Sequence, residues 1–112
     1  MTLKGRLAVD AGSDGVTFEV TVRNGGDEPE ELTFPSGKRV DVAVFADGKS
    51  VWRWSDGRMF TQAVETATLA PGESFTESLT WAEPSAGEYE ARATLAARDA
   101  AVKAVEPFTV SA

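Results

Sequence analysis

The feature that most constrains the fold is a strict alternation of apolar and polar residues between positions 16 and 23. The apolar members and then the polar members of this run are Val16, Phe18, Val20, Val22 and Thr17, Glu19, Thr21, Arg23. Successive side chains of a β-strand point to opposite faces, so this run would bury one face and expose the other. It stops at residues 24–27, an Asn-Gly-Gly-Asp sequence typical of a turn. The pattern predicts a strand of an antiparallel sheet.

Shorter runs of this kind recur along the 112-residue chain, and no segment has the periodicity of an amphipathic helix. The expected strands cover residues 3–9, 16–23, 32–34, 40–45, 49–54, 64–69, 75–81, 88–95 and 105–110. The alanine-rich segment 96–104 is compatible with a helical turn, and we interpret it as a hairpin connection. About eight or nine short strands separated by turns predict an all-β, antiparallel, immunoglobulin-like β-sandwich in a single domain, residues 1–112.

The composition excludes several classes of function. The chain has no cysteine and no histidine. Disulfides, thiolate chemistry and a Ser-His-Asp mechanism are therefore impossible within this chain, and the usual general base near neutral pH is missing. The glycine-containing turns do not match a phosphate-binding loop. We expect no enzymatic activity, no cofactor and no metal.

Charge and hydropathy limit the partners and the location. The 18 acidic and 11 basic residues give a net charge of −7, which argues against nucleic acid and anionic membranes as partners. No apolar run is long enough to span a membrane, and the N-terminus lacks an apolar signal segment. We therefore expect a cytoplasmic protein.

The acidity has two open interpretations, because a salt-loving source and an ordinary acidic protein both fit it. Residues 27–31, Asp-Glu-Pro-Glu-Glu, are the densest acidic segment. Such a loop can offer carboxylates to Ca²⁺, but the spacing of a dedicated calcium loop is missing. A solvated connecting loop is the better interpretation.

The hairpin around the tryptophans Trp52 and Trp54 has two possible registers. A two-residue Asp-Gly turn would pair Asp41 with Trp54, whereas a three-residue loop would pair Asp41 with Arg53 and Val42 with Trp52. We prefer the second register because it sorts apolar and charged side chains onto opposite faces. It predicts an ion pair between Asp41 and Arg53, contributing at most about 1 kcal/mol if it is exposed.

The aromatic residues of this region have more than one possible role. Trp52 and Trp54, together with Phe60, Trp81 and Tyr89, could form a platform for a sugar ring or a peptide. A core position facing the opposite sheet is the preferred interpretation for the two tryptophans.

The turn after the tryptophans is the candidate binding site. It is polar and lies between two aromatic residues, and rigid loops of this kind often carry binding functions. A plain connecting turn is the alternative. The candidate binding residues are Ser55, Asp56, Gly57, Arg58, Met59 and Phe60.

A series of short motifs includes the positions Phe34, Gly37, Asp41, Trp52, Arg53, Trp54, Gln62, Pro71, Gly72, Trp81, Gly87 and Tyr89. In their order and spacing, these motifs resemble the BsuPI intracellular proteinase inhibitor family over residues 16–96. The most specific piece is the Val-Trp-Arg-Trp-Ser sequence of residues 51–55. The family commonly has a tyrosine where this chain has Val40. The resemblance implies a small intracellular β-sandwich that binds a serine protease without catalysing a reaction.

If the turn enters a protease cleft, Arg58 or Met59 is expected to fill the specificity pocket. A structural or protein-interaction module is the alternative function, since free edge strands can pair with another chain. The expected oligomeric state is a monomer or a weak homodimer. A glycan-binding platform is the third alternative.

Overall fold

The computed structural model describes residues 3–12 and 14–111, and within these ranges the chain forms nine strands and no helix. The expectation of an all-β fold is therefore confirmed. In the segment 96–104, residues 96–102 form a connection rather than a helical turn, and residues 103–104 already belong to the last strand. The strands are β1 (Leu3–Gly12), β2 (Gly15–Asn24), β3 (Glu30–Phe34), β4 (Val40–Ala46), β5 (Lys49–Arg53), β6 (Glu65–Leu69), β7 (Ser74–Ala82), β8 (Gly87–Leu95) and β9 (Lys103–Val110).

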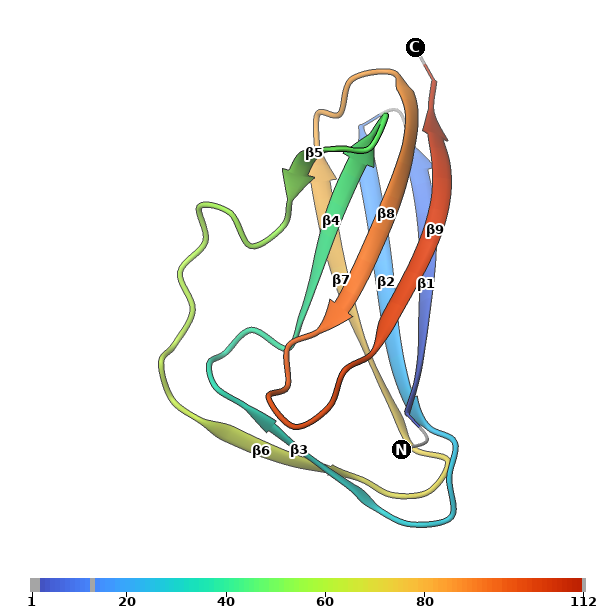
Figure 1. Ribbon diagram of the computed structural model, residues 1–112. Helices are drawn as coiled ribbons and strands as arrows, with labels where there is room; N and C mark the ends of the chain where they lie inside the picture. The colour runs from blue at the N-terminus through green and yellow to red at the C-terminus, as the bar shows by residue number, and fades with distance from the viewer. Residues whose placement is uncertain (1–2, 13, 112) are drawn as a thin grey trace.

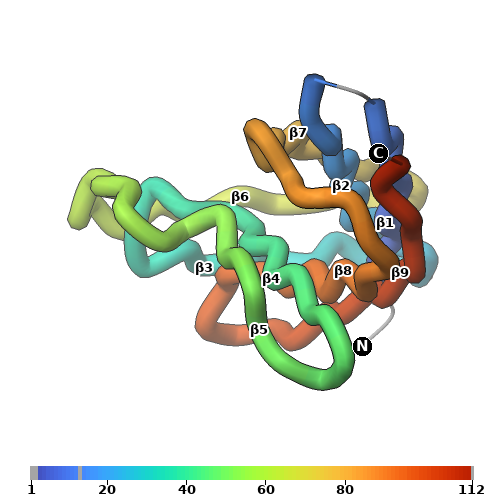
Figure 2. Tube along the Cα trace, turned by 90° about the horizontal axis from the view of Figure 1, so that it is seen from above, coloured from blue at the N-terminus to red at the C-terminus, as the bar shows by residue number. Residues whose placement is uncertain are grey.

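The strands form three antiparallel sheets. One sheet has the order β1-β2-β7, a second has the order β5-β4-β8-β9, and β3 pairs with β6. The two larger sheets face each other as the layers of a sandwich, and the β3–β6 pair runs obliquely across the lower end of the molecule (Figures 1 and 2). This is the immunoglobulin-like arrangement that the strand spacing predicts.

The core follows from the alternation in the sequence. All four apolar residues of the run 16–23 are buried, and they face the buried valines of β4 across the sandwich. Burying each such side chain stabilises the fold by about 1.5–3 kcal/mol before conformational entropy is counted. The outward residues Glu19 and Arg23 stay exposed. The pattern therefore orients β2 correctly without any knowledge of its partners.

One part of the core is a closed ring of aromatic contacts, here called the aromatic cluster. Its members are Phe18, Trp52, Trp81, Tyr89 and Phe108, with neighbouring ring centroids 5.2–5.8 Å apart. Phe18 and Trp81 come from one sheet and the other three from the facing sheet. Aromatic pairs at such distances contribute about 0.5–1.5 kcal/mol each beyond their burial, so the cluster joins the two layers.

The β4–β5 hairpin turns at Asp47 and Gly48, whose φ angles are +53° and +80°. Positive φ at both central residues is the tight hairpin turn that Asp-Gly sequences favour. Next to the turn, Ala46 pairs with Lys49. The register then shifts by one residue, because β5 contains an extra residue, Val51, that has no partner in β4.

Both registers expected from the sequence are wrong. Trp52 lies opposite Val44, not Val42, and Arg53 lies opposite Ala43, not Asp41. The turn contains only two residues, because Asp-Gly adopts the required positive φ angles without a third loop residue. The bulge at Val51 then returns the Trp52 side chain to the inner face of the sheet. Trp52 consequently keeps the expected inward face and stacks on Phe18 of the opposite sheet.

Asn24, fully buried at the end of β2, ties two loops together. Its side-chain amide donates to the carbonyl oxygens of Leu69 (2.9 Å) and Glu28 (2.7 Å), and its backbone carbonyl accepts from Gly72 (2.8 Å). Pro71 and Gly72 of the family motif therefore belong to a turn docked on β2.

The connection between β8 and β9 is fastened to β3. The backbone N–H of Arg98 donates to the carbonyl of Thr33 (2.9 Å), and the backbone N–H of Thr33 donates to a carboxylate oxygen of Asp99 (3.0 Å). The hydrogen bond from Thr33 favours the ionised form and lowers the pKa of the Asp99 carboxyl below its ordinary value.

Across the described ranges, the structure contains no helix long and apolar enough to cross a membrane.

Candidate functional site

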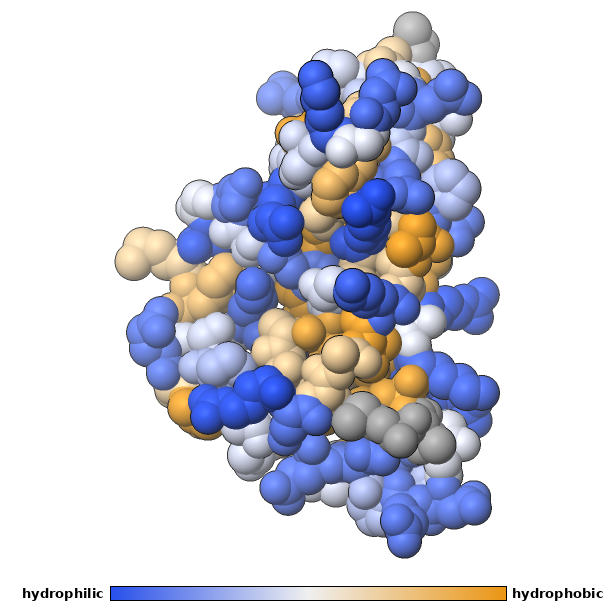
Figure 3. Space-filling view, in the orientation of Figure 1, coloured by the Kyte–Doolittle hydropathy of each residue, from blue (hydrophilic) through white to orange (hydrophobic). Residues whose placement is uncertain are grey.

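The segment between β5 and β6, residues 54–64, is here called the β5–β6 loop. It leaves the sandwich at the end of β5 and swings out on the left of Figure 1 before the chain returns as β6. All candidate binding residues, 55–60, lie on it. Figure 3 shows apolar surface at the outer left edge, where this loop lies.

The start of the loop is fixed by Asp41, which is only 4% exposed. Its carboxylate accepts hydrogen bonds from the backbone N–H of Ser55 (3.1 Å), the Ser55 hydroxyl (2.6 Å) and the backbone N–H of Val42 (2.9 Å). The Lys38 ammonium at 3.4 Å and the Arg53 guanidinium at 3.7 Å supply the positive charge that a buried carboxylate needs. Asp41 therefore clamps β4 to the first residues of the loop.

This clamp corrects the sequence interpretation of Asp41. The expected ion pair with Arg53 is present, but it is diagonal, because Arg53 lies opposite Ala43. The carboxylate is also buried, so its main role is to accept the hydrogen bonds of Ser55. The sequence places Asp41 within an apolar run, but its role as a buried hydrogen-bond acceptor becomes clear only when Ser55 is identified as its partner.

The middle of the loop is built on Trp54. The ring of Phe60 lies against the Trp54 ring with centroids 5.5 Å apart, and the Arg58 guanidinium lies 4.6 Å from the Trp54 ring centroid. The Arg58 Nε–H also donates to the Trp54 carbonyl (2.7 Å). Trp54 is half-buried and packs against the core. Two loop residues are therefore fastened to one ring that is itself anchored.

The far end of the loop is held by Gly37. Its backbone N–H donates to the carbonyl of Thr61 (2.9 Å). A Cβ at position 37 would lie 2.7 Å from the Thr61 hydroxyl oxygen, so a larger residue would require the Thr61 side chain to shift. Gln62 donates from its amide to the Phe60 carbonyl (3.4 Å). Gly37 and Gln62, which the sequence identified only as motif positions, thus both form hydrogen bonds with residues at the end of the loop.

Met59 is the most exposed large apolar side chain of the loop, with 98% of its surface exposed against 57% for Val64. It stands between Arg58 and Phe60, both of which contact Trp54. Asp56 and Gly57 are exposed as well, and Ser55 is half-buried. The loop therefore presents one almost fully exposed apolar side chain, Met59, from an anchored stretch of backbone.

The remaining motif residues lie away from this loop. Phe34 is buried and contacts Phe75 edge-on, while Trp81 and Tyr89 belong to the aromatic cluster. Gly87 begins β8 beside Tyr89. Because Trp52 and Trp81 stack on each other inside the sandwich, these rings do not form an open platform for a sugar.

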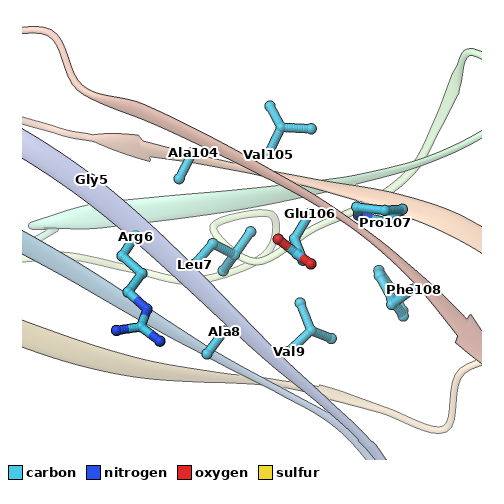
Figure 4. Close-up of a pocket in the computed structure, with 10 residues that line it drawn as sticks. All are labelled: Gly5, Arg6, Leu7, Ala8, Val9, Ala104, Val105, Glu106, Pro107 and Phe108. Atoms are coloured by element: carbon cyan, nitrogen blue, oxygen red, sulfur yellow. The ribbon is translucent and has the colours of Figure 1, made fainter.

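A second surface of interest is the trench between β1 and β9, shown in Figure 4. These strands are edges of different sheets and run side by side in the same direction (Figure 1). The trench has a volume of about 610 Å³ and is lined by residues 5–9 and 104–108. Leu7, Val9 and Glu106 lie between the two strands in Figure 4.

Acidic side chains do not gather into a metal site in the described ranges, where no group of three or more is placed to hold an ion. This holds for the acidic segment 27–31 too, of which residues 27–29 lie in the connection before β3 and residues 30–31 begin that strand rather than a loop.

A family model described as "Intracellular proteinase inhibitor", BsuPI, matches residues 3–100. The chain belongs to the BsuPI family. The match extends the resemblance seen in the motifs from residues 16–96 to nearly the whole chain. No protein of curated function matches the sequence.

Solved structures support the fold of this BsuPI-family chain. It is similar to a β-glucosidase from Kluyveromyces marxianus solved with glucose, with a TM-score of 0.56 and 20% identity over 99% of this chain and 14% of that one. It is similar to β-glucosidase 3B from Thermotoga neapolitana, with a TM-score of 0.56 and 19% identity over 99% and 16%. It thus spans less than a fifth of either enzyme.

A domain of similar length gives the most useful structural comparison. The CARDB domain of a Pyrococcus furiosus protein matches with a TM-score of 0.51 and 21% identity over 98% of this chain and 93% of that domain. At these identities the similarity extends to the immunoglobulin-like sandwich alone.

Proposed function

We propose that the protein is a non-enzymatic inhibitor that binds a serine protease inside the cell through the β5–β6 loop, with Met59 entering the specificity pocket. The observation that carries this proposal is the exposure of Met59, 98%, on a loop held at both ends. The family, whose model is described as an intracellular proteinase inhibitor, supports it.

The anchored loop suits inhibition for an energetic reason. Ordering a flexible loop on binding costs about 0.5–1.5 kcal/mol for each side chain that is immobilised. Here Ser55 is already bonded to Asp41, and Thr61 to Gly37. Arg58 and Phe60 already rest on Trp54. Binding would therefore lose less entropy than it would with a free loop.

The same contacts favour Met59 over Arg58 as the inserted residue. The Arg58 guanidinium lies over Trp54, and its Nε–H is bonded to the Trp54 carbonyl. Inserting it would break both contacts, whereas inserting Met59 breaks none that the structure shows. The preferred target is therefore a protease with a large apolar specificity pocket, not one with an acidic pocket.

Inhibition constants against a panel of serine proteases, at low and high salt, test the proposal. Met59→Asp would place an unpaired charge in an apolar pocket, at a cost of about 3 kcal/mol or more, so we expect inhibition to weaken at least about 100-fold. Met59→Leu is the matched control and should inhibit almost as well as the parent. Undiminished inhibition by Met59→Asp would contradict the proposed role of Met59.

A second candidate is an interaction module that self-associates along the trench between β1 and β9. Two free edges bordering a large trench favour it. Glu106 and Pro107 on the edge of β9 oppose it, since a charge and a proline discourage strand pairing. A stable dimer by light scattering, with no inhibition across the panel, would support this candidate.

A further inference from the structure

We propose that Met59 is a redox switch. Oxidation of its thioether to the sulfoxide by a hydroperoxide would release the protease, and enzymatic reduction would restore inhibition. This inference rests on the proposed function of the β5–β6 loop and adds its regulation.

The first support is the accessibility of the sulfur. Met59 is 98% exposed, so a small peroxide reaches its side chain without any opening of the fold. The chain contains two methionines and no cysteine, and the other methionine is Met1 at the chain start. No thiol therefore competes for the oxidant. Met59 is the methionine whose oxidation changes the proposed contact surface.

The chemistry is a two-electron oxygen transfer. A lone pair of the thioether sulfur attacks the terminal oxygen of the hydroperoxide, a sulfur–oxygen bond forms and the oxygen–oxygen bond breaks. The sulfur is oxidised, and the peroxide is reduced to water or an alcohol after proton transfer. Methionine sulfoxide reductases reverse the change with electrons from thiols, which become a disulfide on the reductant.

The second support is the isolation of Met59 from the fold. With almost all of its surface free, the side chain is not part of the core, so the sulfoxide leaves the sandwich unperturbed. The contacts of Trp54 with Arg58 and Phe60 keep the backbone of the loop in place. The change is therefore confined to the inserted group, as a reversible switch requires.

The effect on binding follows from polarity. A sulfoxide is a strong hydrogen-bond acceptor, and burying such a group in an apolar pocket without a donor weakens binding by about tenfold or more. The unoxidised thioether makes no such demand, because it is apolar and flexible.

The experiment treats the full chain with dilute hydrogen peroxide and follows the mass of the peptide containing Met59. Inhibition is measured before oxidation, after oxidation, and after incubation with methionine sulfoxide reductase and a thiol reductant. We expect a gain of one oxygen on that peptide, a loss of inhibition of about tenfold or more, and recovery after reduction.

Two variants sharpen the result. Met59→Leu cannot be oxidised at this position and should inhibit equally before and after peroxide. Met59→Gln imitates the polarity of the sulfoxide and should inhibit as weakly as the oxidised parent. An equal loss in the parent and Met59→Leu would assign the effect to another residue and overturn the switch.

The switch and the proposed function fail in different ways. If the untreated protein inhibits a protease and full oxidation of Met59 leaves that inhibition unchanged, the switch alone is overturned. If the untreated protein inhibits no protease of the panel, the proposed function fails and the switch fails with it.

Discussion

Trp52 and Trp54 are two residues apart and point to the same side of the chain, yet they belong to different parts of the molecule. Trp52 lies inside β5 and stacks between Phe18 and Trp81 of the facing sheet. Trp54 is the first residue after β5 and carries loop residues on its ring. The sheet ends between them, so one tryptophan joins the layers and the other supports the candidate binding loop.

This difference shows how one short motif can serve both stability and binding. Arg53, between the tryptophans, reaches the carboxylate of Asp41, which also holds Ser55. The core and the loop are therefore coupled through one buried carboxylate. Variants should separate the two roles, with stability lost in one case and inhibition in the other.

Trp52→Ala should have the largest effect on stability. It removes a ring from the aromatic cluster and leaves a cavity between the layers, so the free energy of unfolding should fall by about 3–5 kcal/mol. Chemical denaturation followed by tryptophan fluorescence measures this. Val51→Ala, at the half-exposed neighbour, is the control and should change stability by less than about 0.5 kcal/mol. Equal losses in the two variants would contradict the role of Trp52.

Asp41→Asn should have the second-largest effect on stability. The amide cannot accept every hydrogen bond that the carboxylate accepts, and it carries no charge for Lys38 and Arg53, so we expect a loss of about 1–3 kcal/mol. Inhibition should weaken with it, because Ser55 loses its anchor. Asp47→Asn is the control, since the Asn-Gly turn it creates is equally favourable. Unchanged stability in Asp41→Asn would contradict the clamp.

Trp54→Ala should weaken inhibition more than it lowers stability, which is the opposite of the effect expected for Trp52→Ala. Its half-buried ring supports the loop, so the free energy of unfolding should fall by only about 1–2 kcal/mol. Inhibition per folded molecule should fall by about tenfold or more, because Arg58 and Phe60 lose their support and must be ordered on binding. A stability loss as large as that of Trp52→Ala, with inhibition retained, would contradict the comparison.

The smallest effect is expected at Asp99, far along the chain from both tryptophans. The hydrogen bond from Thr33 lowers the pKa of the Asp99 carboxyl in the folded state. Its stabilisation is therefore present above the unfolded pKa of about 3.9 and is lost as the pH falls through the lower folded value.

The free energy of unfolding, measured as the pH is lowered into the acid range (the acid limb), tests this effect. Asp99→Asn should lose slightly less stability than the parent as the pH falls below about 4, and inhibition near neutral pH should be unchanged. A steeper acid limb in Asp99→Asn than in the parent would contradict the assigned direction of the pKa.

The sequence predicts much of this fold because alternation reports burial directly. The faces of β2 and β8 follow from period-two patterns, since one side of each strand is buried and the other is less buried. In β4 both sides are buried from Val40 to Val44, so alternation there does not report burial. The register of β4 with β5 could not be predicted, because the one-residue bulge at Val51 leaves the same alternation as a longer loop. A shift of two residues leaves every side chain on the same face of the sheet, so the alternation of apolar and polar residues cannot detect it.

The candidate site was predictable in outline but not in its contacts. The turn 55–60 stands out in the sequence as a polar segment between aromatic residues. The choice between Arg58 and Met59 needed the position of the Trp54 ring, and the clamp at Asp41 needed the position of Ser55. The role of Asn24 was missed, because an asparagine before Gly-Gly is already explained as a turn residue.

Hydrogen exchange of the protein, alone and mixed with a serine protease whose catalytic serine is replaced, tests the central claim most directly. We predict that the protease slows amide exchange in residues 55–61 and leaves β1 and β9 unchanged. Slowed exchange in residues 5–9 and 104–108, with the β5–β6 loop unaffected, would contradict the account.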